Sequence, residues 1–288
     1  MIKAALHKRL RATQGIMNLE VDISIAKGSF NALFGPSGVG KTSCLRMLCG
    51  LMKPDSGIIK KDEIAWFNAQ KRMNLKPGQR NIGYVFQDLA LFPNMTVEEN
   101  ILYASGGNDT ELIHELLKIT DLEGLKDQLP NMLSGGQQRR VALIRAIAQK
   151  PDLLLLDEPF SGLDQSIRLK LQDNLELLHD RFGFSVILVS HDLAEVCKLA
   201  DNVWLMEDGK IIKRGSPSEV FGLEAAADQL KLVGKAVQIL EEHLVVSFNG
   251  STFKMKRTPE LNSVEIGQWV QLKIDPQSGQ LNTIDLKQ

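Results

Sequence analysis

The sequence predicts an α/β domain with a mostly parallel sheet, followed by a small β-rich domain. Over residues 1–222, short runs of β-branched residues or leucine alternate with helical patterns, which is typical of βα units. The composition then changes, and from about Val233 onward apolar residues recur with a period of two. The length agrees, because 288 residues correspond to one large domain or to two unequal ones.

The composition is that of an ordinary globular protein. Hydrophobic residues make up 43% and charged residues 24%, which excludes wholesale disorder. Lys and Arg total 34 against 35 Asp and Glu, so a net charge of −1 gives no global attraction for nucleic acid, and no nucleic-acid partner is expected. The apolar runs are shorter than the roughly 20 residues that span a bilayer. Cys44, Cys49 and Cys197 are predicted to be reduced, buried thiols of a cytosolic protein.

Individual elements of the first domain follow from local patterns. Phe30–Phe34, Leu153–Leu156 and Ser185–Val189 are apolar runs of strand length. Gln165–Phe182 repeats apolar residues with a helical period and is followed by a glycine, a common helix terminator. Residues 88–150 have mainly helical patterns, and we expect them to form a helical subdomain.

Turn residues mark the end of the first domain and organise the second. Asp208–Gly209 lies between two short strand patterns, so we expect the first domain to end on a hairpin. Residues 223–232 are predicted to form a linker. Residues 233–288 are predicted to form a small OB-like β-barrel of about five strands. Asn249–Gly250 is the clearest hairpin turn within it.

A phosphate-binding loop is predicted from Gly35 to Thr42, which has the sequence GPSGVGKT between a strand pattern and a helix pattern. The glycines allow backbone N–H groups to approach phosphates, and the helix amino terminus adds partial positive charge. We expect Lys41 to contact the β- and γ-phosphates and the Thr42 hydroxyl to bind Mg²⁺. The motif alone does not distinguish kinases, GTPases and ATPases. The predicted nucleotide-binding residues here are Gly35, Pro36, Ser37, Gly38, Val39, Gly40, Lys41, Thr42 and Ser43.

Two adjacent carboxylates end the predicted strand Leu153–Leu156, in the sequence LLLLDEP. Because side chains alternate along a strand, Asp157 and Glu158 should point to opposite sides and have different tasks. Asp157 is predicted to hold Mg²⁺, directly or through water. Glu158 is then free to orient and deprotonate an attacking water.

A second anion-binding helix end is predicted from Leu133 to Arg140, with the sequence LSGGQQRR. Ser134 is placed to cap the helix that follows. Gly135 and Gly136 expose backbone N–H groups at its start. One chain then has two helix amino termini suited to bind phosphate but only one phosphate loop. This suggests that the second helix end binds the nucleotide of a neighbouring copy.

These motifs occur in the order found in the ATP-binding subunits of ABC transporters, which residues 1–222 resemble. Besides the phosphate loop, the LSGGQ signature and the Asp157–Glu158 pair, the chain has Gln87 in YVFQD, SGLD at Ser161–Asp164 and His191 in SHD. The resemblance implies a P-loop ATPase core with a helical signature subdomain, and ATP and Mg²⁺ as cofactors. It also implies a homodimer in which two copies pack head to tail around two ATP molecules.

The chain departs from the family in one respect. Aromatic residues are missing from positions 1–29, so the adenine stacking common in this family is not expected.

The resemblance also assigns roles to individual residues. The implied catalytic residues are Glu158, His191, Gln87 and Lys41. The implied nucleotide contacts from the signature and the dimer seam are Ser134, Gly135, Gly136, Gln137 and Asp164, and the implied Mg²⁺ ligands are Thr42, Gln87 and Asp157.

The chain is most similar to the importer branch of the family, through LSGGQQRR and the appended β-rich domain. This implies membrane permease partners, indirectly an extracytoplasmic binding protein, and a peripheral place on the cytoplasmic face of the plasma (inner) membrane. Ala65–Pro93 resembles the molybdate-transport ATPases, so import of molybdate or a related oxyanion is expected. The alternatives are a sulfate, iron or polyamine importer, a soluble ABC ATPase, or a nucleotide-dependent binding module without turnover.

Overall fold

The computed structural model describes residues 1–12, 15–107, 109–221, 230–240, 243–248, 251–256, 264–274 and 281–283. The chain divides into two compact units, Met1–Arg214 and Gly215–Gln288. Most of the predicted linker and the Asn249–Gly250 turn lie outside the described residues. Residues 230–232, which the sequence assigns to the linker, belong instead to a strand.

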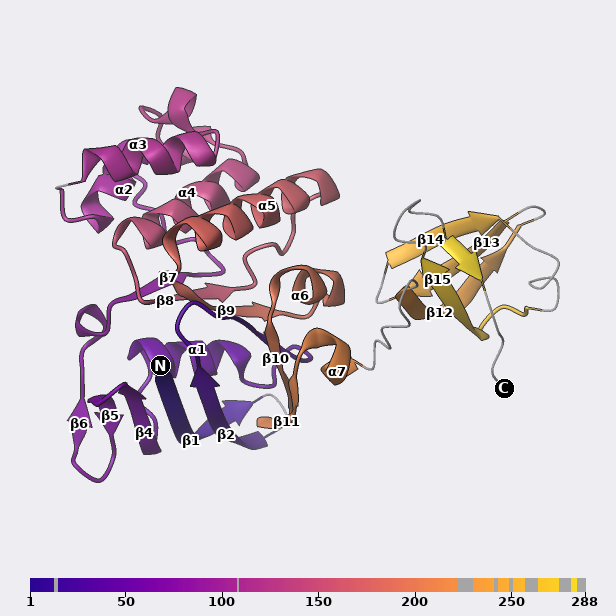
Figure 1. The fold of residues 1–288 in the computed structure, drawn as a ribbon, viewed down its shortest axis with the longest axis horizontal. Helices are drawn as coiled ribbons and strands as arrows, with labels where there is room; N and C mark the ends of the chain where they lie inside the picture. Colours follow the sequence, from indigo (N-terminus) through magenta and orange to yellow (C-terminus); the bar gives the residue numbers. More distant parts are fainter. Residues whose placement is uncertain are drawn as a thin grey trace. The chain divides into compact units, whose positions relative to one another are not determined.

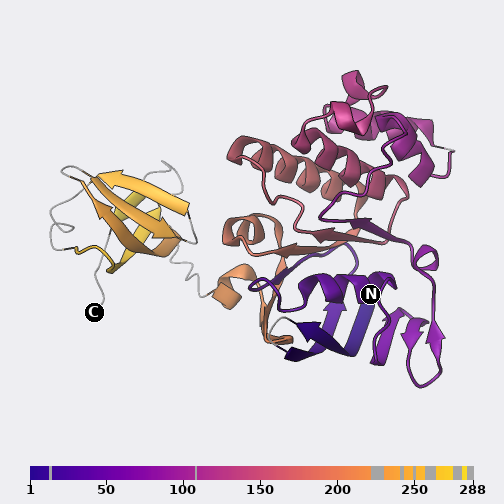
Figure 2. The same cartoon turned by 180° about the vertical axis from the view of Figure 1, so that it is seen from behind.

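The first unit is a sheet with helices on both of its faces (Figures 1 and 2). None of the helices in the described part of the chain is long and apolar enough to cross a membrane. The strands are β1 (Ile2–Ala12), β2 (Gly15–Ile25), β3 (Phe30–Phe34), β4 (Ser56–Lys61), β5 (Ile64–Asn68), β6 (Met73–Asn74), β7 (Ile82–Val85), β8 (Leu153–Asp157), β9 (Ser185–Ser190), β10 (Asn202–Glu207) and β11 (Lys210–Gly215). The α-helices are α1 (Lys41–Cys49), α2 (Val97–Ala104), α3 (Thr110–Ile119), α4 (Gly135–Ala148), α5 (Gln165–Phe182) and α6 (Leu193–Leu199).

The sheet has eleven strands in the order β6-β5-β4-β1-β2-β11-β10-β3-β9-β8-β7. Strands β10, β3, β9, β8 and β7 run parallel, as the alternation of strands and helices predicts. From β2 to β6 the pairings are antiparallel, so the sheet is mixed rather than mostly parallel across its whole width. Short connections account for most of these pairings, because β1 and β2, β4 and β5, and β5 and β6 are each separated by only a few residues, too few for the crossover that parallel neighbours need.

Strand β8 divides the core between the two faces of the sheet. Leu153 and Leu155 pack in the cluster that contains α1, whereas Leu154 and Leu156 pack in the cluster that contains α4 and α5. All four side chains are fully buried, as expected for a strand covered on both faces (Figure 1). The same alternation directs Asp157, the last residue of β8, toward the side of α1.

Several predicted elements are confirmed. Strands β3, β8 and β9 and helix α5 lie where the sequence places them. Helix α5 ends at Gly183, whose φ of 64° suits a glycine at a helix end. Asp208 and Gly209 both have positive φ, 45° and 79°, and connect β10 to β11, which is the geometry of a tight hairpin turn.

The cysteines differ from the prediction at one position. Cys44 and Cys49 are buried in α1, but Cys197 is exposed on α6. The buried residues of this short helix are Glu195, Val196 and Leu199, which leaves residue 197 on the solvent side.

The second unit is antiparallel. Its strands form a sheet in the order β14-β13-β12-β15-β16, and its core includes Ala236, Leu244, Val246, Val264 and Val270. Phe248 of β13 pairs with Ser251 of β14. Closure of this sheet into a barrel stays a prediction. The elements are α7 (Pro217–Phe221), β12 (Leu230–Ile239), β13 (His243–Phe248), β14 (Ser251–Lys256), β15 (Trp269–Ile274) and β16 (Leu281–Thr283).

Candidate functional site

The phosphate loop connects β3 to α1, so its last residues form the amino end of a helix. Gly38 and Gly40 have φ of 85° and 100°, in the left-handed region that other residues rarely adopt. A side chain at Gly40 would also approach Leu19 to 2.9 Å. The backbone path of the loop therefore requires both glycines.

Lys41 begins α1 and folds back over the loop. Its ammonium group donates hydrogen bonds to the carbonyl oxygens of Gly35 at 2.7 Å and Pro36 at 2.8 Å. Burial lowers the pKa of this group, and the nearby carboxylates of Glu158 and Asp157 oppose that shift. A cation held at a helix amino terminus is well suited to bind phosphate oxygens.

Asp157 lies against the start of α1. The Thr42 hydroxyl donates to its Oδ1 at 2.9 Å, and the Tyr84 hydroxyl donates to its Oδ2 at 3.1 Å. Burial raises the pKa of the Asp157 carboxyl group, the two hydroxyl donors oppose this, and the Glu158 charge adds to it. The fold thus joins Thr42 to Asp157, two of the three residues expected to bind Mg²⁺.

The third, Gln87, follows β7 and lines an open cleft together with Thr42 and Asp157. A hydroxyl, an amide and a carboxylate are oxygen donors of the kind that Mg²⁺ prefers. Within the described ranges, His, Cys, Asp and Glu side chains form no group of three or more that could hold a metal. A set with a single carboxylate, as here, fits Mg²⁺ that also binds substrate phosphates, because such sites need only one or two carboxylates.

Tyr84 is a site residue that the sequence analysis did not identify. It lies in β7, which pairs in parallel with β8, and its ring stacks on Phe86 with 4.2 Å between centroids. Burial raises the pKa of its hydroxyl, which therefore stays protonated and donates to Asp157. The sequence YVFQD contains Tyr84, but only the pairing of β7 with β8 brings it to Asp157.

The Glu158 side chain lies beside His191. Its backbone has a φ of 49°, which is uncommon for a residue other than glycine, and its N–H donates to the Val189 carbonyl at 3.1 Å. Its Oε1 lies 3.5 Å from Nδ1 of His191. The two neighbouring carboxylates thus occupy different surroundings, and Glu158 shares its own with the histidine of SHD.

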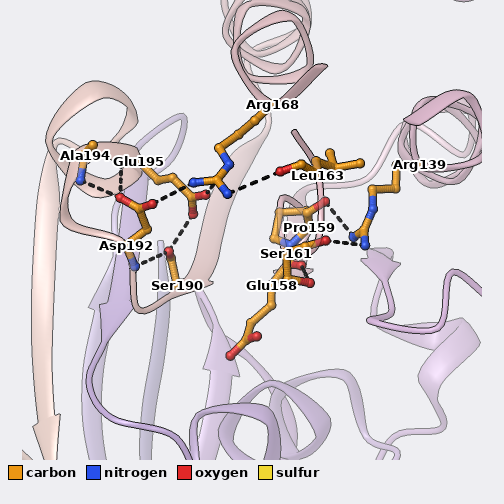
Figure 3. A network of polar contacts seen from close by, with 10 residues as sticks. All are labelled: Arg139, Glu158, Pro159, Ser161, Leu163, Arg168, Ser190, Asp192, Ala194 and Glu195. Carbon is orange, nitrogen blue, oxygen red and sulfur yellow. Dashed lines mark hydrogen bonds and ion pairs between the residues drawn. The ribbon is translucent and has the colours of Figure 1, made fainter. Parts of the chain in front are cut away.

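Arg139 of α4 holds the backbone that follows Glu158 (Figure 3). Its guanidinium donates to the carbonyl oxygens of Pro159 at 2.9 Å and Ser161 at 2.5 Å. The hydroxyl of Ser161 in turn donates to the Glu158 carbonyl at 3.0 Å. The helix that begins with the signature is therefore tied directly to the turn that carries Glu158.

The residues that flank His191 form a second polar network (Figure 3). Ser190 donates to the buried carboxylate of Glu195 at 2.6 Å and accepts from the Asp192 N–H at 3.0 Å. Arg168 of α5 donates to the Asp192 carboxylate at 2.8 Å. The His191 side chain itself is 58% exposed, so its neighbours are fixed while its ring faces solvent.

The signature forms the first turn of α4. Ser134 accepts a hydrogen bond from the Gln137 N–H at 3.3 Å, and the Gln137 side chain accepts one from the Ser134 N–H at 2.8 Å, which confirms the predicted cap. A side chain at Gly136 would meet Ile167 at 2.5 Å, because α4 approaches α5 closely there. Gly135 has open space around it.

Asp164 caps α5 by accepting from the Ile167 N–H at 3.0 Å. It therefore lies at a helix start, as the signature does. In the part of the chain that the structure describes, no hydrogen bond or ion pair joins Asp164 or the signature to the phosphate loop. One chain brings together Lys41, Thr42 and Asp157. Glu158 lies close enough for its charge to act on both Lys41 and Asp157, and it links them to His191.

Known proteins are similar to this chain in sequence and in fold. Residues 19–161 match the family model described as ABC transporter. A probable sulfate/thiosulfate import ATP-binding protein of Chlorella vulgaris is 44% identical over 206 residues, covering 69% of this chain and 85% of that protein. The molybdenum import ATP-binding protein of Aliivibrio fischeri is 34% identical over 269 residues, covering 90% of this chain and 74% of that protein.

The solved structures agree. A dimeric ATP-binding cassette in a post-hydrolysis state, bound to ADP and Pi, is 29% identical with a TM-score of 0.64, and the match covers 75% of this chain and 99% of that one. Its fold class is the one predicted from the phosphate loop and the alternating elements. The chain therefore belongs to the ATP-binding proteins of ABC transporters, in their importer branch, and is an ATP hydrolase of that family.

Proposed function

We propose that this chain energises the import of an oxyanion of the molybdate and sulfate class. The relatives that support this are named for sulfate or thiosulfate import and for molybdenum import. Ala65–Pro93 favours molybdate within that class. The structural observation that carries the catalytic part is the meeting of the phosphate loop, Asp157 and Glu158 where β3 and β8 end.

In this proposal the phosphate loop binds the nucleotide. Lys41 and the backbone N–H groups of residues 35–43 contact the β- and γ-phosphates. Thr42, Gln87 and Asp157 hold Mg²⁺, which neutralises phosphate charge when bound. Lys41 gives two of its three N–H donors to the carbonyl oxygens of Gly35 and Pro36, so binding of the phosphates exchanges at least part of these hydrogen bonds.

Glu158 acts as the general base. A water oxygen forms a bond to the γ-phosphorus while the bond from that phosphorus to the β–γ bridging oxygen breaks, and the water proton passes to the Glu158 carboxylate. His191, 3.5 Å from that carboxylate, orients it and donates to a γ-phosphate oxygen. Glu158 has a positive φ, and Arg139 holds the turn that follows it, so the backbone that carries the base is fixed.

The second half of each site comes from another copy of the chain. Two helix starts supply its contacts, that of α4 with the signature and that of α5 with Asp164. Among the described residues, neither has a polar contact with the phosphate loop of the same chain. Their residues are Ser134, Gly135, Gly136, Gln137 and Asp164. A similar cassette forms a dimer with ADP and Pi. We assign these residues to the nucleotide of the partner. Permease subunits would hold the dimer at the cytoplasmic face of the membrane and receive substrate from an extracytoplasmic binding protein.

The test replaces the native chain in cells with Lys41→Ala and measures cellular Mo, W, S and Fe together with uptake of labelled sulfate. Lys118→Ala, an exposed lysine on α3, is the matched control. Loss of molybdenum, tungsten or sulfate uptake in the first variant alone is the expected result. A deficit of iron alone would overturn the oxyanion assignment. No change in any of these quantities would also overturn it, in favour of an organic substrate or a role outside transport.

A further inference from the structure

Tyr84 fixes the carboxylate that the proposed function assigns to Mg²⁺. Its hydroxyl donates to Oδ2 of Asp157 at 3.1 Å, while the Thr42 hydroxyl donates to Oδ1 at 2.9 Å. Each carboxylate oxygen therefore has its own donor, from a different element. Two donors on opposite oxygens leave the carboxylate little freedom to rotate.

Tyr84 is itself held firmly. Its backbone pairs with Leu155 in the neighbouring strand, two residues before Asp157. Its ring is half-buried against the cluster that contains α1 and stacks on Phe86 with 25° between the ring planes. Because both the backbone and the ring of Tyr84 are fixed, its hydroxyl has a well-defined position.

The segment that carries Tyr84 also carries Gln87. Phe86, on which Tyr84 stacks, immediately precedes Gln87, and both residues line the cleft that Thr42 and Asp157 share. The orientation of Asp157 and the start of the Gln87 segment are therefore set by one short stretch of chain. Tyr84, which is not one of the predicted Mg²⁺ ligands, makes the contact from this stretch to Asp157.

We propose that Tyr84 is a positioning residue for the Mg²⁺ that binds with the nucleotide. Its hydroxyl orients the Asp157 carboxylate so that Oδ1 stays beside Thr42 at the cleft. This inference rests on the proposed function, because it takes Asp157 as the acidic residue of the metal site. Hydrogen-bond partners that orient a metal-binding residue typically change metal affinity by about 10- to 100-fold.

Tyr84→Phe tests this, because it removes one hydroxyl and keeps the ring that stacks on Phe86. The other tyrosine of the sequence, Tyr103, is 65% exposed, so Tyr103→Phe is the matched control. Binding of Mn²⁺ in the presence of ADP is measured by the loss of the free-ion EPR signal. We expect roughly 10-fold weaker Mn²⁺ binding in Tyr84→Phe only. Affinity for ADP in EDTA should be unchanged, which shows that the loop is intact.

Asp157→Asn separates this inference from the proposed function. If Asp157→Asn weakens Mn²⁺ binding but Tyr84→Phe matches the wild type within twofold, the role of Tyr84 is wrong and the metal site stands. If the wild type and Asp157→Asn bind Mn²⁺ equally, Asp157 does not serve the metal, and both the proposed metal site and the inference are overturned.

Discussion

Glu158 carries the sharpest chemical prediction at the scale of single residues. In Glu158→Gln the amide keeps the size of the side chain but cannot accept a proton. We expect ATP hydrolysis to fall by roughly two to four orders of magnitude, with ATP still bound and dimers trapped in that state. Release of phosphate measures the rate, and Glu176→Gln on the exposed side of α5 is the control. Undiminished turnover would remove Glu158 from the role of base.

The cysteines provide a second prediction for single residues. Burial raises the pKa of Cys44 to about 12 and also raises that of Cys49. The thiolate is the reactive form, so both thiols should resist alkylation in the native protein. Cys197 lies on the exposed side of α6. Its sulfur is nevertheless partly buried, and this burial and the charge of Asp192 also raise its pKa. It should react first, and faster as the pH rises.

Brief N-ethylmaleimide labelling followed by mass spectrometry of peptides measures the three rates. Cys197→Ser should abolish labelling of the native protein. Labelling in a denaturant should reach Cys44 and Cys49. Native labelling of Cys44 as fast as that of Cys197 would contradict the burial described for α1.

At the scale of elements, Arg139 couples α4 to the turn after β8. The shorter amide in Arg139→Gln cannot reach both Pro159 and Ser161, so the turn that positions Glu158 should loosen. A misplacement of the catalytic group by about 1 Å can cost 100-fold, and we expect kcat to fall roughly 10- to 100-fold. The KM for ATP should change little, because the phosphate loop is untouched.

Steady-state ATPase assays measure this split between kcat and KM. Arg140→Gln is the control, because Arg140 donates to the Thr120 carbonyl and not to the turn. Arg139→Lys should recover part of the rate, since an ammonium can still donate to a carbonyl oxygen. A change in KM with an unchanged kcat would contradict the proposed coupling.

Elements whose evidence is local were predictable from sequence. Gly183 ends α5, and Ser134 caps α4, because each acts on residues within one turn. The antiparallel side of the sheet and the role of Tyr84 were not predictable in this way. Both depend on which strands become neighbours, and the pairing of β7 with β8 joins residues far apart in the sequence.

For the whole molecule, the central claim is that each ATP site is shared between two copies. The phosphate loop and the signature lie on different elements, and among the described residues no polar contact joins them. A similar cassette forms a dimer, and a symmetric dimer of this chain would provide two equivalent sites, each closed by the second copy. ATP would stabilise the closed dimer and hydrolysis would release it, so both sites bias one two-state transition.

Mixing two inactive variants tests this claim most directly. Lys41→Ala disables the phosphate loop. Gly135→Asp puts a carboxylate at the start of α4, where a side chain has open space and an acidic residue suits the helix, yet repels a phosphate. Gly135→Ala, the control for steric effects, should stay active.

Each variant alone should be inactive in ATP hydrolysis. An equal mixture should recover about a quarter of the wild-type rate, because half of the dimers are mixed and each of these has one site with an intact loop and an intact signature. A mixture as inactive as either variant alone would contradict the shared site.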